Sequence, residues 1–147
     1  MSLSDWAENA WLQAHETSER EIDGLLSIVE RELRDSQVPA ISTDGRFAHA
    51  YRASLTLATV LLHASGYRAA YGRAHHFRTI EAVAEILGAD SKDDVAYLQV
   101  CRAKRNAAEY DAANEATETE ARELVDFAKE LDRTVRKWLA AKNRPAK

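Results

Sequence analysis

The chain has 147 residues, with 20 Lys+Arg against 24 Asp+Glu and a single cysteine, Cys101. This length suits one ordinary domain, and we expect that domain over residues 1–142 with a frayed tail over 143–147. One cysteine excludes an intrachain disulfide and favours a reducing, cytoplasmic location. The first residues lack the features of a signal peptide, and no apolar run is long enough to span a bilayer. We therefore expect neither a secreted nor a membrane protein.

Composition predicts helices throughout the chain. There are 27 alanines but only 5 glycines and 2 prolines, and Pro39 and Pro145 lie outside the periodic segments. Alanine is the best helix former and proline the worst. No alternating pattern typical of a strand is found. We therefore predict an all-α fold, an up-and-down antiparallel bundle of five to six helices with short connections.

Helical periodicity places these helices, in chain order, at about 5–14, 18–35, 44–65, 75–87, 92–113 and 117–142. Ser18 and Thr117 each precede a glutamate by three residues, which is the spacing of a capping box. Ser91 is a candidate cap for the fifth helix. Gly66 and Gly88 follow the third and fourth helices, where glycine commonly ends a helix.

Charge is distributed unevenly along the chain. Residues 45–80 contain no Asp or Glu and have a net charge of +5, whereas the rest of the chain has −9. The segment also holds four of the five histidines, and aromatic residues are interleaved with its arginines: Arg46, Arg52, Arg68, Arg73 and Arg78. Arginine binds phosphate and aromatic rings stack on bases, so the pattern favours a phosphate-bearing ligand. The alternative is that these arginines pair with the acidic second and sixth helices.

A polar face interrupts the fifth predicted helix. Its members are spaced at i, i+3, i+4 and i+7, so they share one side: Arg102, Arg105, Asn106 and Glu109. Tyr110 follows one turn after Asn106. A charge at the edge of a core needs a partner, so this face predicts either a binding site or an ion-pair network, for example with Asp44.

No motif for metal or cofactor binding is found. Adjacent helical residues such as His75 and His76 point about 100° apart and cannot chelate one ion as an i, i+4 pair does. The glycine-rich phosphate loop, the His-Glu-x-x-His zinc motif and the Gly-x-Ser-x-Gly elbow are all missing. We expect no metal ion and no cofactor, and helical spacing makes Cys101 a small core residue.

Five short segments together resemble a known family, through their order and spacing over about residues 20–140. They are Asp44-Gly-Arg46, Ala50-Tyr51-Arg52-Ala53, Gly66-Tyr67-Arg68, His75-His76-Phe77-Arg78-Thr79-Ile80-Glu81 and Arg102-x-x-Arg105-Asn106-x-x-x-Tyr110-Asp111. This combination is similar to the HEPN superfamily, and more narrowly to a bacterial branch of stand-alone HEPN-like proteins. The resemblance implies a helical bundle, a homodimer, and a role either beside a small nucleotidyltransferase or as an RNA-cleaving toxin of a toxin–antitoxin system.

The resemblance also implies a site. Nuclease members of the family use an Arg, commonly followed by Asn, and then a His after four to six intervening residues. Arg105 and Asn106 match, but Tyr110 stands at the His position, and tyrosine with a pKa near 10 is a poor acid–base catalyst at pH 7. We therefore predict a non-catalytic module that binds RNA or a nucleotide. Its candidate site residues are Arg102, Arg105, Asn106, Tyr110, His76, Arg78 and Asp44.

Two alternatives remain open. The chain is an endoribonuclease if Arg105 stabilises the developing charge and His75 or His76 transfers the proton. It is a docking protein if the polar face binds a nucleotidyltransferase or a second copy of the chain. Exposed tryptophans would favour docking, because aromatic anchors dominate interfaces; the candidates are Trp6, Trp11 and Trp138.

Overall fold

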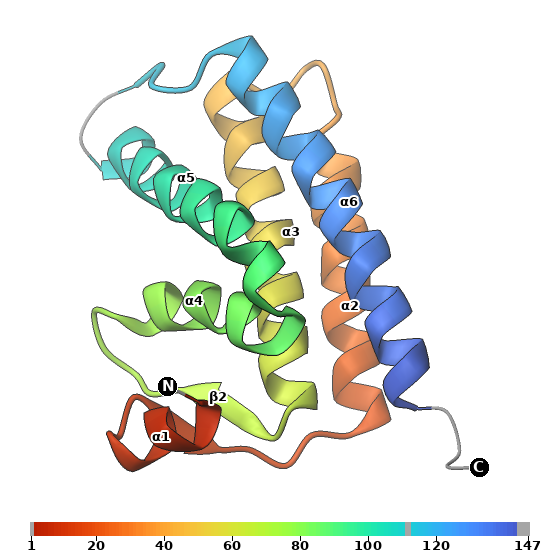
Figure 1. Ribbon diagram of the computed structural model, residues 1–147. Coiled ribbons are helices and arrows are strands. Elements are labelled where there is room, and N and C mark those ends of the chain that lie inside the picture. Colours follow the sequence, from red (N-terminus) through yellow and green to blue (C-terminus); the bar gives the residue numbers. More distant parts are fainter. Residues whose placement is uncertain (1, 111–112, 144–147) are drawn as a thin grey trace.

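The computed structural model describes residues 2–110 and 113–143, and in them the predicted all-α bundle is confirmed (Figure 1). The helices of this part are α1 (Leu3–Glu8), α2 (Glu19–Asp35), α3 (Thr43–Ala64), α4 (His75–Leu87), α5 (Lys92–Tyr110) and α6 (Glu118–Lys142). Short elements complete the chain: β1 (Leu12–Ala14), β2 (Tyr67–Ala69) and the 3-10 turn η1 (Ala89–Ser91). No helix within the described residues is long and apolar enough to cross a membrane.

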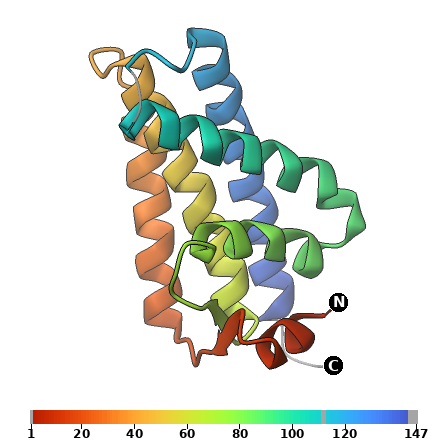
Figure 2. The ribbon, with the colours of Figure 1, turned by 90° about the vertical axis from the view of Figure 1, so that its left-hand side faces the viewer.

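Helix α3 is the centre of the bundle. It is apolar on several sides and contributes many fully buried side chains, as expected of a helix covered all round. It packs against α2 and α6 on one side, and α4 and α5 cross it on the other (Figures 1 and 2). Arg46 near the start of α3 pairs with Glu118 at the start of α6, so these two helices run in the same direction.

The predicted helix ends are confirmed at several caps. Thr117 forms a complete capping box with Glu120. Ser18 accepts a hydrogen bond from the backbone N–H of Glu21, but the Glu21 carboxylate bonds elsewhere. Gly66, which follows α3, has a φ of +94°, a left-handed conformation that glycine adopts without strain. Capping residues that can be recognised in the sequence therefore mark where these helices start and stop.

Replacing the Thr117 cap gives a stability prediction. Thr117→Ala removes the side-chain acceptor for the Glu120 backbone N–H, and we expect the free energy of unfolding to fall by about 1 kcal/mol. Urea denaturation followed by circular dichroism measures the change. Thr134→Ala, in the exposed middle of the same helix, is the control and is expected to change stability by less than about 0.5 kcal/mol. An equal loss in both variants would contradict the capping role.

The N-terminal segment differs from the prediction. The expected helix over 5–14 is wrong beyond Glu8, and the expectation of no strand is wrong as well. Ala10 has a φ of +61°, which ends the helix, and β1 then pairs antiparallel with β2, with Leu12 opposite Ala69. Burial drives this change, because a second apolar cluster beside the main core holds residues from both strands: Trp6, Leu12, Leu62, Ala69 and Ala82.

The fifth helix is described as α5 over Lys92–Tyr110. The sequence predicts it over 92–113; residues 111–112 lie outside the described part of the chain, and residue 113 is not helical. Ser91 belongs to η1, the turn that leads into α5. The predicted tail over 143–147 lies outside the described residues except for Asn143.

Candidate functional site

A groove of about 380 Å³ lies between the β2–α4 connection and α5. Its lining is aromatic, imidazole, guanidinium and amide in character: Tyr71, Gly72, Arg73, His75, His76, Arg102 and Asn106. None of these lining residues carries a carboxylate. We call this cavity the α4–α5 groove. Because its lining carries guanidinium groups and no carboxylate, the groove is suited to an anion.

The start of α4 contributes the two histidines. Gly72, with a φ of +138°, allows the connection to turn, and its carbonyl accepts a hydrogen bond from the His75 backbone N–H. The first turn of α4 has no acidic residue, and Ala74 at its N-cap provides no side-chain acceptor. The first backbone N–H groups of a helix carry partial positive charge, which adds to the attraction for an anion in this groove.

Helix α5 contributes the polar face that the sequence predicts. Arg102 and Asn106 lie one turn apart and both line the groove. Arg102 Nε donates to Gln99 Oε1 at 2.8 Å, and Gln99 Nε2 in turn donates to the carbonyl of Phe77 at 3.1 Å. Gln99 thereby holds α4 against α5 and orients the Arg102 guanidinium. Arg105 Nη1 donates to Asn106 Oδ1 at 3.3 Å.

Burial and nearby positive charge keep the groove histidines uncharged at pH 7. Burial lowers the pKa of His76 below 6.5; His75, when protonated, and the permanent charges of Arg105 and Arg102 lower it further. Burial also lowers the pKa of His75, with a smaller effect from Arg68. At pH 7 the groove thus presents neutral imidazoles beside permanent guanidinium charges.

The structure brings together three of the predicted site residues and separates others. Arg102, Asn106 and His76 line one groove. The guanidinium carbon of Arg78 instead lies 3.8 Å from the centre of the Trp11 ring. The Asp44 carboxylate accepts hydrogen bonds from the backbone N–H groups of Asn114 and Ala116, which fixes the connection before α6. Tyr110 ends α5, and its side chain lies outside the described part of the structure.

Arg105 is adjacent to the groove without lining it. Its guanidinium carbon lies 5.7 Å from the centre of the buried Tyr51 ring, and its charge lowers the pKa of His76. Arg105 therefore influences the groove through its positive field and through its hydrogen bond to Asn106.

The arginines of residues 45–80, which we call the acid-free segment because it contains no Asp or Glu, divide between the two interpretations. Some form ion pairs with α2 or α6, and others lie where a ligand could bind. Arg46 pairs with Glu118, and Arg52 Nε lies 3.7 Å from Glu32 Oε1, as the ion-pair alternative predicts. Arg68 instead lies 4.9 Å from the Tyr71 ring. Arg73 lines the α4–α5 groove. The part of the segment that follows α3 therefore directs its charge toward rings and cavities.

Tyr71 and Arg73 are groove residues that the site prediction missed. Tyr71 is 78% exposed, and its ring stacks on His75 with centroids 5.7 Å apart and planes 6° from parallel. Both residues lie in the acid-free segment, whose charge was the available signal, but no spacing rule connects that loop to α5.

A second cavity, of about 540 Å³, adjoins the α4–α5 groove at Tyr71 and His75. It shares these two residues with the α4–α5 groove and adds His15, His63 and Arg68. A larger cavity of about 680 Å³ lies between α2 and the end of α6. That one has mixed charge, with Glu19 and Asp23 facing Arg136 and Lys142, and contains none of the predicted site residues.

Two groups of side chains in the described residues have donor atoms close enough to hold a metal ion. They are His15 with Glu21 and His63, and Glu32 with Asp35 and His49. In the second group, burial alone would raise the pKa of Glu32, but hydrogen bonds from His49 and Arg31 bring it below its ordinary value. The sequence predicts neither group, because each is assembled by helix packing.

No family model matches the chain, and neither the curated proteins nor the solved structures contain a significant match. Within the described residues the chain is an all-α bundle with a groove that is lined by guanidinium, imidazole and amide groups.

Proposed function

We propose that the chain is a HEPN-like helical module that binds a phosphate-bearing ligand, RNA or a nucleotide, in the α4–α5 groove. The observation that carries this proposal is the convergence of Arg73, Arg102 and Asn106 on one cavity whose lining has no carboxylate. The chain as a whole has a net charge of −4, so this concentration of positive charge is local. Guanidinium groups bind phosphate oxygens through paired hydrogen bonds.

Aromatic groups at the edge of the groove favour a nucleotide over a simple anion. The exposed Tyr71 ring lies against His75, where a base can stack. The second cavity shares Tyr71 and His75 with this groove and is also lined by Arg68, so a nucleic-acid strand with more than one phosphate can contact both cavities. This arrangement supports single-stranded RNA as the first probe.

Fluorescence anisotropy with a labelled single-stranded RNA tests the proposal, with AMP and inorganic phosphate as competitors. We expect saturable binding that weakens as salt increases, because phosphate contacts release counterions. Arg73→Ala is expected to reduce the affinity. The control is Arg133→Ala, which removes an exposed arginine of α6 that is paired with Glu130. Equal affinities in both variants, or no binding by folded wild-type protein, would refute the site. Competition by AMP separates nucleotide binding from a requirement for RNA.

The position of His76 favours one alternative function. Helix α4 brings this imidazole into the groove beside Arg102 and Asn106, and its lowered pKa leaves it neutral and able to accept a proton at pH 7. His76, which comes from α4, can thus supply the imidazole that nuclease members of the family have at the position of Tyr110. Incubating RNA with wild-type protein, His76→Ala and Arg105→Ala tests the endoribonuclease. Cleavage lost in both variants would support it, whereas no cleavage by wild type leaves a binding module.

Docking to a nucleotidyltransferase or to a second copy remains a prediction. Trp6 is buried, and Trp11 and Trp138 are half-buried, so none of these tryptophans offers the exposed anchor that would favour docking. Multi-angle light scattering of the purified protein measures whether the expected homodimer forms.

The affinity for RNA is expected to depend on pH through His76. A bound phosphodiester favours the charged imidazole and so raises the pKa of His76 from its lowered value in the free protein. Binding then takes up a proton, and affinity rises as pH falls from about 7.5 to about 6, by at most about tenfold per pH unit for one proton. Because a phosphodiester keeps its charge over this pH range, the change in affinity must come from titration of the protein. His76→Gln is expected to flatten the profile, and a pH-independent wild type would contradict this role.

A further inference from the structure

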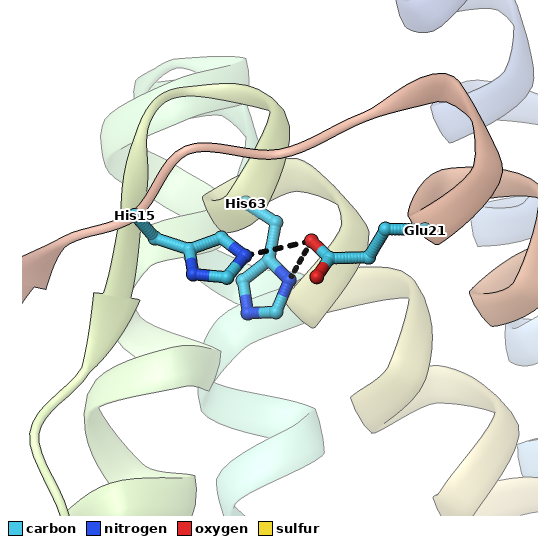
Figure 3. Close-up of side chains that lie close together, drawn as sticks. All are labelled: His15, Glu21 and His63. Atoms are coloured by element: carbon cyan, nitrogen blue, oxygen red, sulfur yellow. Dashed lines mark hydrogen bonds and ion pairs between the residues drawn. The ribbon is translucent and has the colours of Figure 1, made fainter.

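Two histidines and one glutamate converge at one point (Figure 3), and the two histidines also line the second cavity. His15 Nε2 lies 2.7 Å from Glu21 Oε1, and His63 Nδ1 lies 3.0 Å from the same oxygen. The three residues come from the segment after β1, the first turn of α2 and the last turn of α3. Donor atoms of all three lie within 4.8 Å of one another. We call this group the His15–Glu21–His63 cluster.

Backbone contacts bring these elements together. The His15 backbone N–H donates to the carbonyl of Gly66 at 2.9 Å, which places His15 beside the end of α3 where His63 lies. Ser18 caps α2 and orients its first turn, so that Glu21 faces both rings. The cluster is therefore held by main-chain hydrogen bonds as well as by its own side chains.

We infer that His15, Glu21 and His63 bind one divalent transition-metal ion, with Zn²⁺ as the preferred occupant. Two imidazole nitrogens and one carboxylate oxygen are a common ligand set for such ions. Bonds of about 2.0–2.1 Å to a tetrahedral ion require ligand atoms about 3.3 Å apart. The observed separations of 2.7 and 3.0 Å from Glu21 Oε1 thus need an expansion of only a few tenths of an ångström.

The protonation states of the cluster suit this ion. Hydrogen bonds from His15 and Thr17 hold the Glu21 carboxylate ionised, with a pKa of about 2. Burial lowers the pKa of His63, so its ring is neutral at pH 7. An ion would bind the His15 Nε2 and His63 Nδ1 atoms that face Glu21 Oε1, and each ring would then carry its proton on its other nitrogen.

Surrounding groups supply an outer shell and an open side. Thr17 Oγ1 donates to Glu21 Oε1 at 2.7 Å and helps to fix the carboxylate. His15 and His63 both line the 540 Å³ cavity, so a fourth position on the ion would face solvent or a ligand there. Three protein ligands with one open position is the arrangement of reactive rather than purely structural zinc sites.

Titration of the chelator-treated full chain with Co²⁺ and Zn²⁺ tests the inference. Tetrahedral Co²⁺ absorbs visible light, and Zn²⁺ should displace it. We expect one equivalent to bind. Glu21→Gln, which keeps the size of the side chain, and His63→Ala should each weaken binding by more than the roughly 10–100-fold that loss of an outer-shell partner costs. Circular dichroism verifies that both variants fold.

Two further variants locate the ion. His76→Ala removes a histidine of the α4–α5 groove and should leave Zn²⁺ affinity unchanged. His49→Asn tests the other group, with Glu32 and Asp35, and should also leave it unchanged. The inference is overturned if wild type binds no ion, if Glu21→Gln and His63→Ala bind as tightly as wild type, or if His49→Asn abolishes binding. These titrations contain no RNA or nucleotide, so the outcome is independent of the proposed function.

Discussion

Replacing Arg102 with alanine is expected to weaken the binding of single-stranded RNA about 10- to 100-fold. A hydrogen bond from a charged group contributes about 1.5–3 kcal/mol, and about 1.4 kcal/mol corresponds to a factor of ten. Arg102 lines the groove, and its Nε bond to Gln99 leaves the terminal nitrogens to approach a phosphate. Anisotropy at a fixed salt concentration measures the loss.

Two controls separate binding from folding in this experiment. Arg102→Lys keeps the charge but loses the planar fork, so we expect an intermediate affinity. The salt dependence of Arg102→Ala should be shallower than that of wild type by about one phosphate contact. Unchanged affinity in a folded Arg102→Ala protein would place the ligand elsewhere, with the second cavity as the next site to test.

Replacing Leu57 with alanine is expected to lower the free energy of unfolding by about 2–5 kcal/mol. Leu57 is fully buried on α3 and belongs to the main apolar core. Truncation removes apolar contacts and leaves a cavity that the surrounding helices fill only in part. Urea denaturation gives the change. Val100→Ala, at a position 64% exposed on α5, is the control and should stay within about 0.5 kcal/mol of wild type. A small effect at Leu57 would mean that α3 is not the centre of the core.

Most helices were predictable because their signals are local. Apolar periodicity and caps such as Thr117 and Gly66 act within a few residues, and the structure places helix ends there. The β1–β2 pair was not predictable in this way. Each strand has only three residues, and the partners Leu12 and Ala69 are far apart in the sequence. Burial of Trp6 against distant side chains, rather than local propensity, determines this part of the fold.

The same distinction holds for the candidate sites: residues on one helix were predictable, and residues brought together by packing were not. Arg102 and Asn106 were found because helical spacing places them on one face of one helix. His15 and His63 were missed because three separate elements must pack before they meet. Glu21 illustrates the limit most clearly. The spacing of Ser18 and Glu21 predicts a capping box, and the Ser18 side chain does accept a hydrogen bond from the Glu21 backbone N–H. The Glu21 carboxylate, however, contacts His63 of α3, and no local sequence pattern predicts that contact.

The small apolar cluster around Trp6 and Leu12 is separate from the main core, so the N-terminal segment can behave as its own cooperative unit. Native-state hydrogen exchange should then show the Ala70 amide, which donates to the Trp11 carbonyl, exchanging sooner than amides in the middle of α3. Such partial opening would carry His15 away while Glu21 and His63 remained on their helices. Access to one side of the second cavity would thus be controlled by a folding equilibrium of roughly the first sixteen residues.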